Sequence, residues 1–268
     1  MSLRITQNIE ALTASRHLQT TSMSLTKSME KLSSGYRINS AADDAAGLGI
    51  SEAMRSQIRG LAQGQKNIQD GISMVQTAEG NLDEVHSMLQ RIRELAVQYK
   101  NGSLDTNARS SIQNEVNQLA SEINRISAQA NFNGTPLLNS ASTISFQVGA
   151  NDGQEIGVST IDLAATVGTS YAQLSAGTNT DISEIDAAIT AISNARAGFG
   201  AVQNRLEHTL SLQAAYQENL TAAESRIRDV DMAEEMVNLT KTQIIQQAGV
   251  AMLSQANQQP QSVLKLLG

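Results

Sequence analysis

Residues 54–99 read MRSQIRGLAQGQKNIQDGISMVQTAEGNLDEVHSMLQRIRELAVQY, and every seventh position of this stretch is apolar. These positions are Met54, Leu61, Ile68, Val75, Leu82, Leu89 and Ala96. A second apolar stripe runs beside the first and drifts slowly around it, as expected for a nearly straight helix. Asn101 and Gly102 follow, and both residue types favour a helix end. The stretch therefore predicts one long helix with a continuous apolar edge.

The same sevenfold spacing returns in the C-terminal half of the chain. Two stripes begin at Ile185 and Ala188 and continue every seven residues to Ile227 and Val230, with twelve of fourteen positions apolar. This is a coiled-coil pattern. A helix over residues 181–230 would be about 75 Å long at 1.5 Å per residue. Two such helices can bury one another's stripes, so the sequence predicts a mainly α protein shaped as an elongated rod. The predicted core residues are Leu61, Ile68, Val75, Leu82, Leu89, Ile192, Phe199, Leu206 and Leu220.

Between the two helical halves the spacing of the apolar residues changes from seven to two. Apolar and polar residues alternate over residues 144–148 and again over residues 156–158, on either side of GANDG at residues 149–153. This pattern predicts a small β-hairpin. Residues 166–180 are rich in Gly, Ser, Thr and Ala and read as a loop, and a shorter helix is expected over residues 106–130.

Both ends of the chain carry weaker helical stripes. The stripes are interrupted and rich in Gln, Ser and Thr, so we expect the ends to need a partner and to become ordered on assembly. The predicted assembly residues are Leu18, Leu25, Leu32, Met236, Leu239, Ile244 and Leu253. The expected domains are a terminal coiled coil of residues 1–43 and 231–268, a central helical rod of residues 44–139 and 181–230, and a β-hairpin and loop over residues 140–180.

Composition argues against several classes of function. Only 3% of the residues are aromatic and Trp is absent, whereas ligand pockets usually have aromatic walls. With a formal net charge of −7, the chain lacks the excess of basic residues that is typical of a nucleic-acid-binding protein. Cys is absent, which rules out disulfides and thiolate metal sites. The sequence holds no apolar run of about 18 residues, and its N-terminus does not read as a conventional signal peptide.

The residues that could bind a metal or take part in catalysis are scattered along the chain. His17, His86 and His208 lie in different segments, without a second histidine at ligand spacing, so no metal site is expected. Asp43 and Asp44 precede glycines but lack the lysine and the preceding strand of a phosphate loop. They fit the first turn of the long helix, whose positive end favours acidic residues. We therefore expect no enzyme activity and no cofactor.

Two functions from different classes remain open at this point. The first is a self-assembling structural protein, and the alternative is a soluble coiled-coil tether or signalling stalk. The predicted hairpin and the loop NFNG at residues 131–134 favour the first, because a simple stalk needs neither.

Several motifs of the chain resemble signatures of the bacterial flagellins. Residues 30–50 read EKLSSGYRINSAADDAAGLGI, which is similar to the N-terminal signature of that family. Further matches are LQRIRELAVQ at residues 89–98, NFNGTPLL at 131–138, SRIRDVD at 225–231 and QQAGVAMLSQAN at 246–257. The matches follow the family's order over residues 1–140 and 181–268. The short middle leaves no room for the large variable domains that many flagellins carry.

The resemblance implies a structural subunit that polymerises into the bacterial flagellar filament for motility. It implies export through the type III channel to the extracellular filament, and pairing of the two chain ends as an antiparallel coiled coil. The implied partners are other copies of the chain, a flagellar export chaperone, filament cap and hook-junction proteins, and the animal Toll-like receptor for flagellin. Neither nucleic acid nor a membrane is expected as a partner.

One face of the helix over residues 54–99 is a candidate contact surface. On a helical wheel Glu94 points away from the apolar edge, and Leu95 lies at the flank of that edge, where we expect partial exposure. The resemblance implies that this face is both a contact between subunits and the surface that the receptor recognises in the monomer. The predicted surface comprises Gln90, Arg91, Glu94, Leu95 and Gln98, with Glu115 on the next helix.

Overall fold

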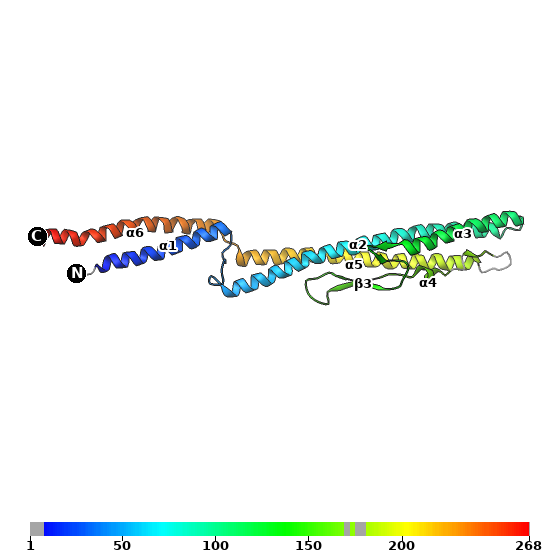
Figure 1. Ribbon diagram of the computed structural model, residues 1–268, viewed down its shortest axis with the longest axis horizontal. Coiled ribbons are helices and arrows are strands. Elements are labelled where there is room, and N and C mark those ends of the chain that lie inside the picture. The colour runs from blue at the N-terminus through cyan, green and yellow to red at the C-terminus, as the bar shows by residue number, and fades with distance from the viewer. Residues whose placement is uncertain (1–7, 169–171, 175–180, 268) are drawn as a thin grey trace. The chain divides into compact units, whose positions relative to one another are not determined.

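The computed structural model describes residues 8–168, 172–174 and 181–267, and most of these residues are helical. The helices are α1 (Ile9–Ser34), α2 (Ala45–Tyr99), α3 (Thr106–Gln129), α4 (Leu163–Val167), α5 (Asp181–Arg228) and α6 (Met232–Leu267). The strands are β1 (Asn131–Phe132), β2 (Thr135–Pro136), β3 (Thr143–Gln147) and β4 (Glu155–Ser159) (Figure 1). The predicted fold class is confirmed in that long helices from both ends of the chain accompany a small β-hairpin.

The described residues fall into two compact units. One comprises the described part of Met1–Ser56 and Asn219–Gly268, and the other is Gln57–Glu218. Both boundaries lie within long helices, α2 and α5. The terminal unit therefore extends further along the chain than the expected domain of residues 1–43 and 231–268. The physical reason is that the first turns of α2 bind to the end of α5.

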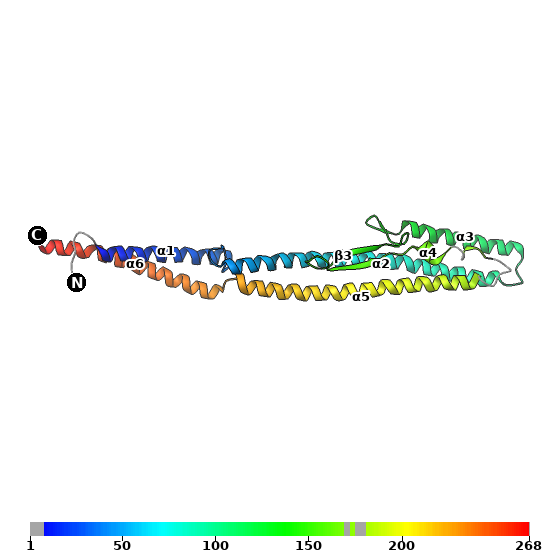
Figure 2. The same cartoon turned by 90° about the horizontal axis from the view of Figure 1, so that it is seen from below.

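In the terminal unit, α1 and α6 lie side by side and run in opposite directions (Figures 1 and 2). The Asn8 side chain caps α1 by accepting from the Ala11 amide at 3.0 Å, and it donates to the Ala256 carbonyl at 2.7 Å. The seam between the helices is shallow, because only Ser28 is buried among their described side chains. The pairing of the chain ends that the resemblance implies is thus present, with little burial.

In the unit Gln57–Glu218, α2 and α5 form the central antiparallel pair. Gln65 near the start of this part of α2 donates to Gln217 near the end of α5 at 2.8 Å. Arg93 near the end of α2 donates to Asp186 near the start of α5 at 2.5 Å. Residue numbers on α5 therefore fall as those of their partners on α2 rise, which means that the two helices are antiparallel.

The apolar stripes of α2 and α5 bury one another as predicted. Eight of the nine predicted core residues are at most 4% exposed, namely Leu61, Ile68, Val75, Leu82, Leu89, Ile192, Phe199 and Leu206. Leu220 departs from the prediction because it is half-buried and belongs to the terminal unit. The apolar seam gives way to amide side chains before it reaches Leu220. Gln213 takes the next heptad position, and its buried Oε1 has no hydrogen-bond partner among the described residues.

The third helix, α3, confirms the helix expected over residues 106–130. Asp105 caps it, since its carboxylate accepts from the Ala108 amide at 2.8 Å. Its buried residues include Ile112, Val116 and Ile123, which join the same apolar cluster as α2 and α5.

Two small elements were not foreseen. Strands β1 and β2 pair through a turn in which Asn133 has φ 47° and Gly134 has φ 80°. Two consecutive positive φ values are what a tight two-residue hairpin requires. Helix α4 ends at Val167, within the expected loop of residues 166–180, of which residues 169–171 and 175–180 lie outside the described part.

The predicted hairpin is confirmed as β3 and β4, which pair from Thr143 with Ser159 to Gln147 with Glu155. The end of the hairpin lies very close to α2, where Asn67 donates to the Gln147 carbonyl at 2.8 Å. The close approach depends on glycines at positions 60, 64 and 71 of α2. A Cβ built at position 64 would overlap the Val148 carbonyl oxygen and lie 2.8 Å from its carbon.

We predict opposite effects for two glycine-to-alanine changes in α2. Gly80→Ala meets nothing within 4 Å and should stabilise the protein by about 0.5–1 kcal/mol, because alanine loses less entropy in a helix. Gly64→Ala should instead destabilise it by about 1–3 kcal/mol, because the hairpin backbone must move. Urea unfolding of the full chain followed by circular dichroism measures both. Equal stabilisation by the two changes would contradict the close contact between hairpin and helix.

Candidate assembly and recognition surfaces

The motif of residues 30–50 forms the connection from α1 to α2, and the end of α5 is bonded to it. Helix α1 ends at Gly35, which has the left-handed φ of 75°. The Arg37 amide then donates to the Arg228 carbonyl at 2.6 Å, and the Val230 amide donates to the Gly35 carbonyl at 3.0 Å. We call residues 35–44 and 52 together with residues 227–230 the helix joint.

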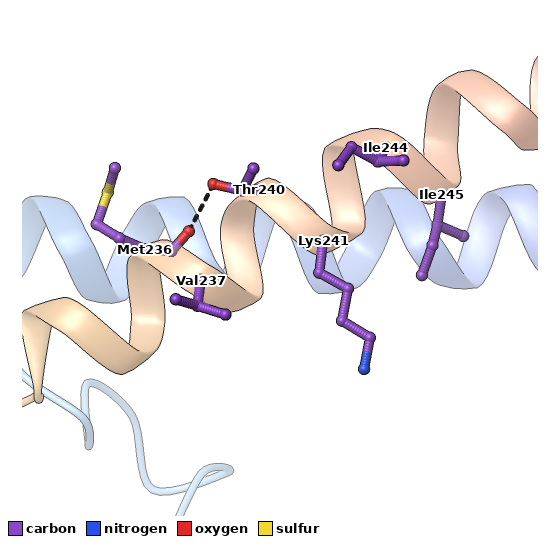
Figure 3. A pocket seen from close by; sticks show the side chains of 6 residues that line it. All are labelled: Met236, Val237, Thr240, Lys241, Ile244 and Ile245. Carbon is purple, nitrogen blue, oxygen red and sulfur yellow. Dashed lines mark hydrogen bonds between the residues drawn. The ribbon is translucent and has the colours of Figure 1, made fainter.

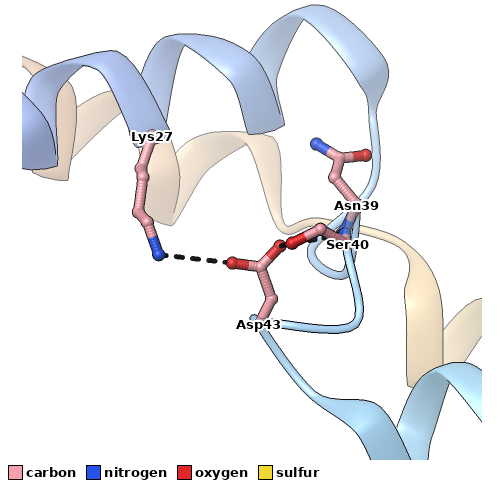
Figure 4. A network of polar contacts seen from close by, with 4 residues as sticks. All are labelled: Lys27, Asn39, Ser40 and Asp43. Carbon is pink, nitrogen blue, oxygen red and sulfur yellow. Dashed lines mark hydrogen bonds and ion pairs between the residues drawn. The ribbon is translucent and has the colours of Figure 1, made fainter.

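Asp43 organises the loop of the helix joint (Figure 4). Its carboxylate accepts from the Ser40 amide at 3.1 Å and from the Ser40 hydroxyl at 3.0 Å, and it forms an ion pair with Lys27 at 3.4 Å. These hydrogen bonds, that of the Ser40 amide foremost, hold the pKa of Asp43 below its ordinary value. Asp44 begins α2 by accepting from the Gly47 amide at 2.9 Å. The acidic pair therefore shapes the start of the helix, as the sequence predicts.

Arg228 connects three segments of the helix joint. Its guanidinium donates to the Glu52 carboxylate at 2.6 Å and lies 4.8 Å from the centre of the Tyr36 ring. Its side chain is only 12% exposed, so the positive charge depends on these partners. The hydrogen bond from Arg228 is the main reason why the pKa of Glu52 lies below its ordinary value, and Arg55 adds to the effect.

We predict that Glu52 makes the helix joint sensitive to acid. A carboxylate with a lowered pKa in the folded state contributes stability at neutral pH and loses it as the pH falls through that pKa. Glu52→Gln should lower the melting temperature at pH 7, and the difference from the unchanged protein should shrink below about pH 4. Thermal melts across this pH range measure the effect. Glu84→Gln, at an exposed position of α2, is the control, and an equal response of the two variants would refute the role of Glu52.

The predicted contact face on α2 is exposed and is linked to α3 by an ion pair. The Arg91 guanidinium donates to Glu115 of α3 at 2.9 and 3.1 Å and to Glu94 at 3.0 Å. Glu94 and Glu115 raise the pKa of Arg91, which stays charged. The Arg91 side chain is still 51% exposed, and Gln90 and Gln98 are exposed beside it. Five of the six predicted residues thus lie on one accessible surface.

The expected exposure of Leu95 is wrong. Leu95 is 2% exposed and belongs to the apolar cluster. A helical wheel gives α2 one apolar edge for one partner helix, whereas α2 packs against both α5 and α3. The sequence held a weaker signal for the second partner, since Met74, Met88 and Leu95 are buried and share a heptad position that only the half-buried Asn81 interrupts. Leu95 therefore supports the contact face from below and is not part of it.

The predicted assembly residues of the chain ends divide into two groups. Leu18, Leu25, Leu32, Leu239 and Leu253 are half-buried along α1 and α6. Met236 and Ile244 are exposed, at 50% and 61%. Figure 3 shows them beside a shallow groove on α6 that Val237, Thr240, Lys241 and Ile245 also line.

The sequence reasoning missed a larger apolar surface on the two terminal helices. Among the described residues, sixteen large apolar side chains are exposed, and eleven of them belong to α1 and α6. We call these eleven the terminal outer surface: Ile9, Leu12, Met23, Met29, Met232, Met236, Val237, Ile244, Ile245, Val250 and Met252. Monomeric proteins rarely expose extensive apolar surface, so this concentration of exposed apolar side chains on two helices indicates surface that partners cover.

The described residues hold neither a helix long and apolar enough to cross a membrane nor a group of three or more potential metal ligands.

Comparison with known proteins identifies the family. The family profile of the bacterial flagellin N-terminal helical region matches residues 5–143, and that of the C-terminal helical region matches residues 182–267. The chain belongs to the bacterial flagellin family. It is a structural subunit that polymerises into the extracellular flagellar filament, which serves motility, and it is not an enzyme. The family membership gives no support to the alternative of a tether or signalling stalk.

Known flagellins match this chain over nearly its whole length. A flagellin of Halalkalibacterium halodurans is 51% identical over 98% of this chain and 99% of its own length. A flagellin of Bacillus subtilis is 47% identical over 99% of this chain and all of its own length. The flagellar filament 33 kDa core protein of Treponema phagedenis is 48% identical over 98% of this chain and 99% of its own.

Solved structures show the same fold. The crystal structure of Bacillus cereus flagellin covers 55% of this chain and 88% of its own, with 32% identity and a TM-score of 0.50. A putative flagellar hook-associated protein from Vibrio parahaemolyticus covers 70% of this chain and all of its own, with 16% identity and a TM-score of 0.60. The second likeness concerns the fold alone.

Proposed function

We propose that the terminal outer surface is where one flagellin subunit holds the next in the filament. The observation that carries this proposal is the concentration of exposed apolar side chains on α1 and α6. A filament subunit must bury part of its surface against its neighbours, and burial of apolar surface is the dominant favourable term in most protein association.

The charge distribution on α6 supports a second copy of the chain as the occupant. Residues 242–258 contain no Asp, Glu, Lys or Arg. Burial of this segment therefore removes no charged group from water, which would otherwise oppose association. Many copies of one uncharged apolar surface can pack together without charge repulsion between them.

The shallow seam between α1 and α6 supports the proposal that the ends become fully ordered only on assembly. Its heptad positions include Thr21, Ser28, Gln246 and Gly249 beside the leucines. Such a seam buries too little apolar area to offset the entropy of ordering two long segments. The neighbours in the filament supply the missing burial.

We predict that Val237→Gln combined with Ile244→Gln prevents polymerisation. These residues are 68% and 61% exposed and lie seven residues apart, on one side of α6. Each change removes about 1.5–3 kcal/mol of apolar burial from the interface, which raises the critical concentration by roughly a factor of ten or more. Sedimentation measures the critical concentration. Hydrogen exchange of α1 and α6 should slow on polymerisation of the unchanged protein.

The control for this variant is Asn238→Gln combined with Ser254→Gln. It places the same amides at exposed positions of α6 without removing apolar surface. The control should polymerise like the unchanged protein. Normal filaments from the Val237 and Ile244 variant would show that the terminal outer surface does not hold subunits together.

We also propose that the exposed face of Gln90, Arg91, Glu94, Gln98 and Glu115 has two uses. In the filament it contacts a neighbouring subunit, and in the monomer it is recognised by the animal Toll-like receptor for flagellin. Two carboxylates already orient the Arg91 guanidinium, and an oriented arginine is a residue type that often dominates binding at interfaces. Because both uses need the same face, assembled filament should bind the receptor poorly.

We predict that Arg91→Ala weakens binding of the monomer to the receptor by at least about 30-fold, as expected for an interface hot spot. Arg125→Ala is the matched control, because Arg125 is 52% exposed and forms an ion pair with Glu122 of the same helix. Surface plasmon resonance with immobilised receptor ectodomain measures both. Equal binding by the two variants, with unchanged helical content, would exclude Arg91 from the recognition site.

The family membership further supports a flagellar export chaperone, filament cap proteins and hook-junction proteins as partners. A hook-associated protein shares this fold, so a junction protein can present helices like those of another subunit to the end of the filament. A purified junction protein that binds the unchanged monomer, but not the monomer of the Val237 and Ile244 variant, would support this use of the terminal outer surface.

A further inference from the structure

The methionines of the chain are unevenly distributed between its surface and its core. The chain has nine Met. Five of them, Met23, Met29, Met232, Met236 and Met252, are 48–65% exposed, and all five belong to the terminal outer surface. In the other unit, Met74 and Met88 are at most 7% exposed. The thioether groups that solvent can reach are therefore concentrated where the subunits are proposed to meet.

A thioether on this surface is open to one specific reaction. A two-electron oxidant such as hydrogen peroxide transfers an oxygen atom to the sulfur as its O–O bond breaks. The sulfur is oxidised to a sulfoxide, the peroxide is reduced to water, and the side chain loses no proton. Because the chain has no Cys, no thiol competes for the oxidant.

We propose that these five methionines form an oxidation site that blocks assembly of the monomer. The inference rests on the proposed role of the terminal outer surface. A sulfoxide is polar and needs a hydrogen-bond donor when it is buried. Met236 lies beside the groove with Val237, Ile244 and Ile245, whose side chains offer no donor. The Thr240 hydroxyl already donates to the Met236 carbonyl at 2.8 Å, and the Lys241 side chain points away from that of Met236 (Figure 3). Met232 lies one turn before it, so oxidation would place two sulfoxides close together on one helix.

Burial between subunits should protect these methionines from oxidation in the filament. A methionine that a neighbouring subunit covers is shielded from the oxidant, as Met74 and Met88 are shielded within the monomer. Oxidation therefore acts on subunits before they are incorporated, and reduction by methionine sulfoxide reductases restores them.

The first experiment treats the full-length monomer with hydrogen peroxide and maps the oxidised residues by peptide mass spectrometry. The five exposed methionines should be oxidised before Met74 and Met88. The critical concentration should rise at least about tenfold, the lower end of what an unpaired buried polar group costs. Treatment with MsrA and MsrB together should restore it. Normal polymerisation by protein oxidised at all five positions would overturn the proposal, as would equal oxidation rates in filament and monomer.

The second experiment replaces the five methionines with leucine, which keeps a similar apolar volume. This variant should polymerise equally well before and after peroxide treatment, and loss of polymerisation after peroxide would overturn the proposal. If the leucine substitutions themselves impair assembly, the test is whether the reductases restore polymerisation of the oxidised, unsubstituted protein. Failure to restore it would overturn the proposal. The Val237 and Ile244 variant tests the terminal outer surface without an oxidant. If that variant fails to polymerise while oxidised protein polymerises, only the oxidation site is refuted.

Discussion

Mutual burial of sevenfold apolar stripes is the interaction on which the unit Gln57–Glu218 depends. Leu61, Ile68 and Val75 of α2 and Ile192, Phe199 and Leu206 of α5 are nearly inaccessible to solvent. With few aromatic residues in the chain, aliphatic side chains at regular spacing must supply the burial. The pair of α2 and α5 leaves other faces of α2 free for further elements to pack on. Helix α3 covers a third stripe of α2, and the β3–β4 hairpin lies on the glycines that remove side-chain bulk from the same helix.

The terminal unit uses the same spacing with a different outcome. The seam of α1 and α6 alternates leucines with Thr, Ser, Gln and Gly, so it sets the register of the pair but buries little. The larger apolar side chains, such as Val237 and Met252, lie outside the seam and remain exposed. The chain thus divides its apolar residues between a core that one molecule completes and an exposed surface that, as we propose, neighbouring subunits cover.

Most of the fold could be predicted from the sequence, but less of the contact surfaces. Sevenfold and twofold spacing predicted α2, α5 and the β3–β4 hairpin because each pattern reports one buried edge of one element. Leu95 was expected to be partly exposed because one apolar edge predicts one partner helix, whereas α2 has two. Gly60 and Gly64 carry a further signal, because their spacing marks where the hairpin backbone approaches α2. At the chain ends, heptad spacing selects mainly residues that face the other helix, such as Leu18, which lies close to Gly249 of α6. Most of the exposed apolar residues, such as Val237, lie outside these heptad positions, so a search for intramolecular seams does not select them.

On the proposed contact face, the exposed ion pairs contribute little to folding and are suited to recognition. Arg91, Glu94 and Glu115 are each about half exposed or more, and water screens ion pairs at such positions. Their geometry nevertheless fixes the guanidinium across two helices, and a partner that binds there need not supply the entropy of ordering it. The apolar layer beneath, which includes Leu95 and Val116, holds the two helices at the distance that this pairing needs. The position of Arg91 on the contact face therefore depends on the packing of Leu95 beneath it.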